Sequence, residues 1–166
     1  MATRARIGLK LEDGSIISAY HHWDGYPEWL GVTLEEHYNT KEKIAKLIDG
    51  GNMSSCYSDN EYDEEKQEFV KNDPRPVYYG GDDERPHNNY SIQEFLHDAN
   101  ACEEYLYIFT SQDTIDSNYH NIRNTIFANQ GWKAFSVRPI YDNDYNVINN
   151  NILPVEIPEP ELEEVA

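Results

Sequence analysis

Histidine and aspartate side chains gather in one short segment near the start of the chain, and both residue types can bind a metal ion. His21, His22, Asp24 and Tyr26 lie within six residues, and His37 follows eleven residues after Tyr26. Consecutive residues of a strand point to opposite faces, so His21 and His22 cannot both reach one ion without distortion. His21, Asp24, Tyr26 and His37 remain as an alternative pocket for a small enzyme or a ligand-binding domain. We predict no metal site, because a histidine among aromatic residues at a strand end packs more often than it ligates.

Cys56 is a second candidate for chemistry, because a thiolate beside a histidine can act as a nucleophile. It follows Ser54 and Ser55 in a Gly-rich turn, but the local sequence resembles no cysteine-protease or hydrolase motif. Cys56 and Cys102 lie far apart in sequence, which predicts free thiols rather than a C-x-x-C pair. The glycine pairs lack the spacing of phosphate-binding loops. We therefore predict a protein that is not an enzyme, with no catalytic residue and no cofactor.

Acidic residues with interleaved tyrosines dominate the middle of the chain. Residues 59–73 hold seven acids and two lysines, and a second acidic run follows Gly80 and Gly81. Neither this segment nor residues 142–144 has the ligand spacing of an EF-hand calcium loop. Exposed acids attract basic surfaces, and tyrosine is favoured at protein interfaces. We predict a partner-binding surface formed by these two runs: Asp59, Glu61, Tyr62, Asp63, Glu64, Glu65, Asp82, Asp83 and Glu84.

The charge of the whole chain is strongly negative, with 31 acidic and 13 basic residues and a formal net charge of −18. Such a field repels nucleic acid and anionic membranes and attracts basic proteins. Acidity of this kind either keeps a protein soluble or imitates the phosphate array of DNA. The sequence also lacks an apolar run of the ~20 residues that a membrane-spanning helix needs. We therefore expect a cytoplasmic protein that binds neither nucleic acid nor a membrane directly.

The N-terminal third of the sequence predicts two strands followed by a helix. Apolar residues alternate over residues 5–11, and a second strand is expected over residues 15–22. Asp13–Gly14 between them is typical of a type I′ hairpin turn. Residues 27–38 have apolar positions at helical spacing. Asp24 is the expected cap of this helix, and Pro27 suits its first turn.

The rest of the sequence predicts short elements separated by acidic or Asn-rich segments. Thr40 is the expected cap of a second helix that ends at Asp49, and Ser91 begins a capping box for a third. Residues 113–129 are ambiguous. The expected strands are residues 76–79, residues 104–110, and residues 132–141 paired with residues 145–148.

Together these elements predict an α+β fold, with a mostly antiparallel sheet and two to four helices packed on one face. Residues 1–150 form the expected single domain, with a solvated acidic loop at about 57–75. Residues 151–166 form an acidic tail that we expect to be disordered.

Several short motifs near the N-terminus occur together in a fixed order. The motifs are Arg6-Ile7-Gly8, Asp13-Gly14, Tyr20 to Pro27, Gly31, Thr33, Leu34, Tyr38, Lys46-Leu47-Ile48 and Gly51 to Ser55. With them the chain resembles an uncharacterised family of small accessory proteins encoded by bacteriophages and prophages. The resemblance is specific over about residues 4–56 and loose to about residue 138. It implies a viral protein of the host cell cytoplasm and carries over no catalytic residue.

From charge and resemblance together, we expect an accessory protein that acts in host takeover or against host defence. It would bind a host or viral nucleic-acid-handling protein with a basic surface, and inhibit or redirect it through the acidic surface, as a DNA mimic does. One alternative is a small enzyme or ligand-binding domain with its pocket near residues 21–37. Another is a virion or assembly component. The sequence leaves the oligomeric state open.

Overall fold

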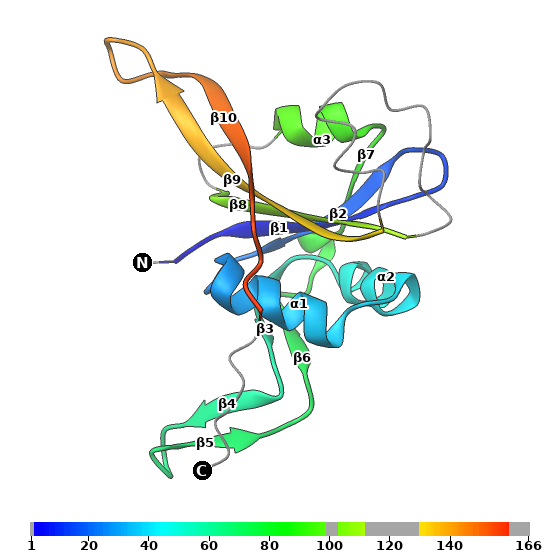
Figure 1. Cartoon of the computed structure of the whole chain (residues 1–166), viewed down its shortest axis with the longest axis vertical. Coiled ribbons are helices and arrows are strands. Elements are labelled where there is room, and N and C mark those ends of the chain that lie inside the picture. The colour runs from blue at the N-terminus through cyan, green and yellow to red at the C-terminus, as the bar shows by residue number, and fades with distance from the viewer. Residues whose placement is uncertain (1, 99–102, 112–129, 160–166) are drawn as a thin grey trace.

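A twisted, eight-stranded mixed sheet carries the other elements of the molecule (Figure 1). The structure is a computed structural model that describes residues 2–98, 103–111 and 130–159. The strand order is β10 (Val147–Val155), β9 (Gly131–Tyr141), β8 (Tyr105–Thr110), β1 (Ala5–Lys10), β2 (Ile16–His21), β3 (Met53–Tyr57) and β6 (Arg75–Tyr78), with β7 (His87–Asn89) paired to β2. The pairs β1–β8 and β2–β3 are parallel, and the other neighbours are antiparallel. The predicted α+β class and mostly antiparallel sheet are confirmed.

A tight turn joins β1 to β2, as predicted, but it is not of type I′. Gly14 has a positive φ of 87°, whereas Asp13 does not, and type I′ needs two such residues. Gly14 N–H donates to the carbonyl of Leu11 (3.0 Å), and Leu11 N–H donates to that of Ser15 (2.8 Å). The Asp13 carboxylate accepts from Ser15 N–H (2.9 Å). These bonds fix a three-residue loop, in which one left-handed residue is enough.

Three helical segments cover one face of the sheet, below it in Figure 1. They are a single π-helical turn η1 (Pro27–Gly31), α1 (Val32–His37) and α2 (Lys41–Asp49). Thr40 caps α2 as predicted, because its hydroxyl accepts from Lys43 N–H (3.2 Å). The predicted cap at Asp24 is wrong. Asp24 lies in the left-handed region (φ 58°), and Tyr26 takes the N-cap position before Pro27.

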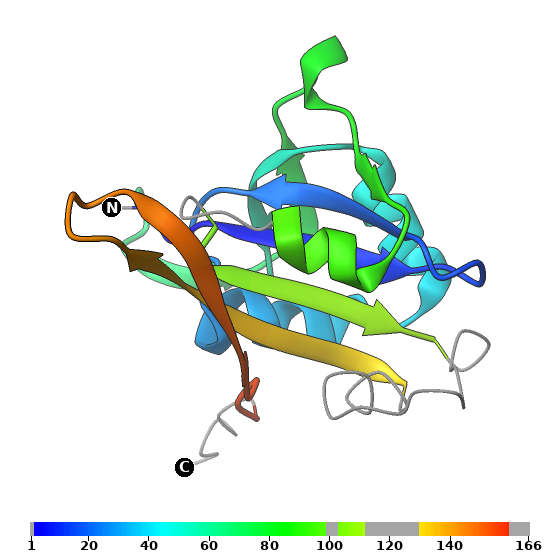
Figure 2. The same ribbon diagram turned by 90° about the horizontal axis from the view of Figure 1, so that it is seen from above.

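The fourth helix, α3 (Ile92–Asp98), lies on the opposite face of the sheet, so the helices occupy both faces rather than one (Figures 1 and 2). Ile92 and Phe95 pack there in a second apolar cluster with Leu106 of β8. Ser91 Oγ accepts from Glu94 N–H (3.1 Å), which is one half of the predicted capping box. The Glu94 carboxylate accepts instead from the side chain of Asn89 (3.0 Å).

The predicted acidic loop at about 57–75 is wrong, because the chain forms strands there. β4 (Asn60–Asp63) and β5 (Glu68–Lys71) pair in an antiparallel hairpin that projects from the body (Figure 1). Tyr62 and Phe69 lie directly opposite each other, with ring centroids 5.3 Å apart. Cross-strand aromatic pairs stabilise a sheet, and this pair outweighs the acidic composition. A short 3₁₀ turn, η2 (Asp82–Glu84), follows β6.

The predicted disordered tail begins too early, because a strand continues past residue 151. β9 and β10 pair as predicted, but β10 continues to Val155. Val155 and Ile157 then pack against the main core, and a Cβ on Gly31 would lie only 3.1 Å from Ile157. Residues 113–129 and 160–166 of the predictions lie outside the described residues. Among the described residues, no helix has the length and apolar character needed to cross a membrane.

Tyr107→Phe should destabilise the fold, because the fully buried Tyr107 hydroxyl donates to the Gly25 carbonyl across the core (2.6 Å). Without this bond a buried carbonyl loses a partner, and the free energy of unfolding should fall by about 1–3 kcal/mol. Urea denaturation measures the change. Tyr145→Phe is the matched control, since Tyr145 is well exposed. Equal losses in the two variants would contradict a specific role for the Tyr107 hydroxyl.

Candidate functional site

The segment with the predicted alternative pocket is largely a structural bend between β2 and η1. His22 Nδ1 lies 2.8 Å from the Tyr20 hydroxyl, and its ring meets Trp23 edge-on at 4.6 Å. Gly25 N–H donates to the carbonyl of Thr3 (2.8 Å). These bonds give the bend a fixed shape.

The four residues of the alternative pocket do not line a common hollow in the described part of the chain. His21 is 1% exposed and lies on the helix-covered face of β2. Burial, reinforced by the nearby His22, lowers the pKa of His21 to about 3, so the ring is neutral near pH 7. Asp24 is exposed in the bend, and burial raises the pKa of Tyr26. His37 lines a hollow elsewhere, at the end of α1.

Cys56 has the properties of an inert thiol. It lies on β3 rather than in a turn, is 3% exposed and is not in a disulfide, as predicted. Burial raises its pKa to about 12, although a hydrogen bond with Tyr38 acts in the opposite direction. A thiol with this pKa holds almost no thiolate at neutral pH. Cys102 lies outside the described residues.

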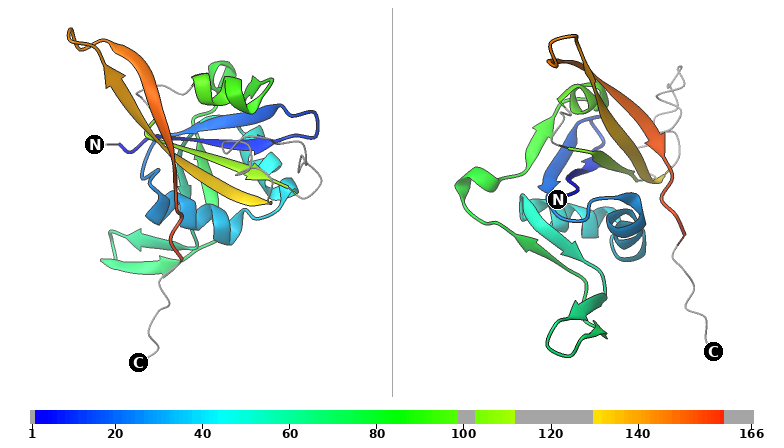
Figure 3. Two further views of the ribbon diagram at one scale, coloured as in Figure 1. Left: turned by 45° about the horizontal axis from the view of Figure 1, so that its top comes forward. Right: turned by 90° about the vertical axis from the view of Figure 1, so that its left-hand side faces the viewer.

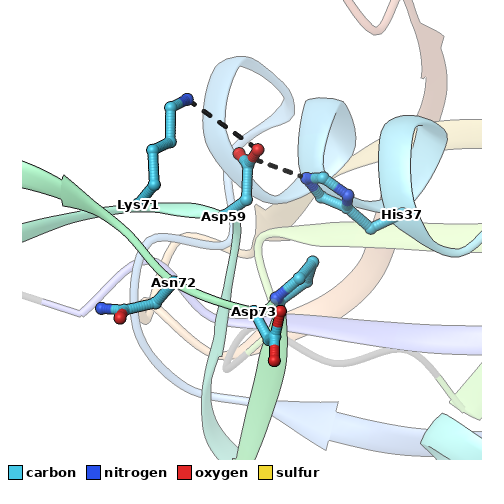
Figure 4. Close-up of a pocket in the computed structure, with 6 residues that line it drawn as sticks. His37, Asp59, Lys71, Asn72 and Asp73 are labelled. Carbon is cyan, nitrogen blue, oxygen red and sulfur yellow. Dashed lines mark ion pairs between the residues drawn. The ribbon is translucent and has the colours of Figure 1, made fainter.

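The hollow at His37 is lined mostly by polar residues and has a volume of about 700 Å³. Figure 4 shows Asp59, which precedes β4, between His37 and Lys71, which ends β5. His37 Nε2 lies 3.6 Å from Asp59 Oδ1, and Lys71 Nζ lies 3.8 Å from Asp59 Oδ2. Glu36 Oε2 is also 3.6 Å from His37 Nε2. The hollow therefore joins the last turn of α1 to the base of the hairpin.

The predicted partner-binding residues form two separate groups rather than one surface. In the right-hand view of Figure 3, the hairpin β4–β5 projects at the bottom and η2 lies at the left, with β6 between them. Tyr62, Glu64 and Glu65 are exposed on the hairpin, and Glu61 belongs to β4. Asp82 and Asp83 are exposed on η2.

Three of the predicted partner-binding residues make contacts within the fold. The Asp63 carboxylate accepts from the backbone N–H of Glu65 (2.9 Å) and of Lys66 (3.1 Å), which closes the hairpin turn. The Glu84 carboxylate accepts from the side chain of Asn52 (2.9 Å). Asp59 lines the hollow at His37. These three are therefore less free to meet a partner than the exposed acids around them.

Comparison of the chain with protein-family models, with curated proteins and with solved structures gives no match. No residue acquires a role by similarity. Geometry, exposure and charge are therefore the grounds on which function is inferred.

Sequence reasoning missed the grouping of Glu36, His37 and Asp59. It assigned His37 to the bend and Asp59 to the interaction surface, and it did not single out Glu36. The grouping depends on the turn of the chain between β3 and β4, which brings Asp59 back to the end of α1. A Glu-His pair at the end of a helix is a weak signal by itself, because it does not reveal this distant third residue.

Burial of His21 should make the protein less stable as the pH falls. The folded pKa lies below the unfolded value of 6.5, so the unfolded chain binds more protons between pH 6.5 and 3. The contribution is complete above pH 6.5, and about 2 kcal/mol of it should be lost between pH 7 and pH 5. His21→Leu should flatten this dependence, as measured by urea denaturation at several pH values.

His97→Gln is the control for the pH experiment, because the His97 side chain is exposed on α3. This variant should retain the wild-type dependence on pH. If His21→Leu also retains it, His21 is not the buried neutral group described above.

Proposed function

We propose that this chain is an accessory protein of a bacterial virus that binds a nucleic-acid-handling protein of the host or of the virus. Binding would inhibit or redirect that protein, and the contact surface would be the acidic hairpin, defined as residues 60–71. The family resemblance of the N-terminal motifs supports the viral origin. The projection of an exposed aromatic pair among acidic side chains supports the contact surface best.

The aromatic pair of the acidic hairpin has the character of an interface anchor. Tyr62 is 54% exposed and Phe69 is 59% exposed, although each ring packs against the other. Aromatic side chains carry much of the binding energy at protein interfaces because they bury a large area and lose little conformational entropy. A pair placed on facing positions of two strands has a defined arrangement before a partner arrives, which lowers the cost of binding.

Charge supports a partner with a basic surface. The acidic hairpin contains five acids and two lysines, and the whole chain has a formal charge of −18. Proteins that bind nucleic acid have positively charged surfaces, which neutralise phosphates. Such a surface is the electrostatic complement of the hairpin, whereas nucleic acid itself would be repelled.

Burial of the reactive groups supports a binding role over an enzymatic one. His21 is neutral and enclosed, and the pKa of the Cys56 thiol is well above neutral. Neither group is available as a general base or nucleophile at neutral pH. Exposed acids lie on the acidic hairpin, on η2 and on other parts of the surface.

The variant Glu64→Gln/Glu65→Gln/Glu68→Gln should weaken partner binding by about tenfold or more, because it removes three exposed charges from the acidic hairpin. The wild-type protein should retain a nucleic-acid-binding protein from bacterial lysate at about 50 mM NaCl and lose most of it at about 300 mM. Mass spectrometry identifies the retained protein, and its affinity for the purified chain is then measured at both salt concentrations.

Glu28→Gln/Glu42→Gln/Asp144→Asn is the matched control, because it removes three exposed acids that lie outside the acidic hairpin and η2. It should keep wild-type affinity. Binding that is independent of salt, or equally weak in both triple variants, would contradict the proposal. Stable association with virus particles instead would favour the assembly component.

A further inference from the structure

His37 ends α1 with a ring nitrogen that is buried but has no hydrogen-bond partner among the described residues. That atom is Nε2, and the side chain as a whole is 18% exposed. Two carboxylate oxygens face it at 3.6 Å, one from Glu36 and one from Asp59. This separation is longer than an N–H···O hydrogen bond, so the three polar atoms converge without bonding to one another. Buried polar atoms without a partner are uncommon, because they cost free energy.

The spacing of these three atoms matches the ligands of a metal ion. Zinc lies about 2.0–2.1 Å from histidine nitrogen and about 2.0–2.2 Å from carboxylate oxygen. With bonds of about 2.1 Å, two ligand atoms 3.6 Å apart subtend an angle of about 118° at the ion. All three ligand atoms lie within 4.8 Å of one another.

We propose that Glu36, His37 and Asp59 bind one divalent transition-metal ion, and that the preferred ion is Zn²⁺. The combined charge of one neutral imidazole and two carboxylates is equal and opposite to that of a divalent ion. Mg²⁺ and Ca²⁺ prefer sites made of oxygen ligands, whereas imidazole suits zinc and its neighbours in the first transition row. The inference concerns a site outside the proposed contact surface and does not depend on the proposed function.

The surroundings of the three residues leave room for one more ligand. The site borders the hollow of about 700 Å³ that Asn72, Asp73 and Pro74 also line (Figure 4). A water molecule can occupy the fourth position of a tetrahedral ion from that side. Lys71 lies beside the other oxygen of Asp59, at 3.8 Å, and leaves Oδ1 directed at His37.

A bound ion would connect two separate elements of the chain. Glu36 and His37 belong to the last turn of α1, whereas Asp59 lies in the link between β3 and β4. Coordination would therefore hold the base of the acidic hairpin against the body. Because the folded site binds the ion and the unfolded chain lacks the geometry, zinc should also raise the melting temperature.

Isothermal titration of the tag-free, EDTA-treated full chain with ZnCl₂ tests the site. We expect one ion per chain, with binding weakened about tenfold or more in His37→Gln and in Asp59→Asn. Millimolar Mg²⁺ should not displace the ion. Co²⁺ gives a second readout, because four-coordinate cobalt absorbs strongly in the visible range, and His37→Gln should lose this absorption.

Glu35→Gln is the matched control, because it removes one charge from the same helix without touching the three ligands. It should bind zinc as the wild type does. Circular dichroism confirms that each variant is folded. If His37→Gln does not fold, Asp59→Asn provides the test of the site. The proposal is overturned if the wild type binds no zinc, or if a folded ligand variant binds it with wild-type affinity. Equal affinity for Mg²⁺ or Ca²⁺ would overturn it too, since the acidic surface alone would explain such binding.

Discussion

Burial of the central strands on both faces is the constraint on which the rest of the fold depends. In β8 every second residue faces one apolar cluster, with Tyr107 and Phe109 on the side of α1 and α2. Leu106 and Ile108 between them face the cluster under α3. A strand that is apolar on both sides needs a covering layer on each. This requirement explains why helices lie above and below the sheet and why β1 and β8 can pair in parallel.

Local patterns predicted the elements where one physical effect dominates. Thr40 marked the start of α2 because its hydroxyl satisfies a backbone N–H, and the apolar run of β8 marked a strand. The same uninterrupted apolar run also indicated that both faces of the sheet are covered. The alternating pattern of other strands pointed instead to one covered face. The acidic hairpin was missed because composition was given more weight than the aromatic residues. The pairing of Tyr62 with Phe69 becomes visible only when the turn between them is known.

The candidate site shows a different limit of sequence reasoning. Burial of His21 follows from strand alternation, since His21 and Ala19 share a face of β2. The approach of Asp59 to His37 has no local signal, because it arises from the path of the chain between two strands. The interior groups His21 and Cys56 are uncharged at neutral pH, whereas exposed acids lie on the acidic hairpin and on η2. Such a division favours recognition by contact over chemistry inside a cleft.

The position of the acidic hairpin in the chain has a consequence for how this molecule can change. Tyr57 and Arg75, on either side of the hairpin and its two links, are paired neighbours in β3 and β6. The chain thus leaves the sheet and returns to it at one place, as an insertion does. Residues between these two points can be replaced, lengthened or deleted while the paired ends stay in register. The proposed contact surface is therefore a module, and its specificity can evolve separately from the stability of the core.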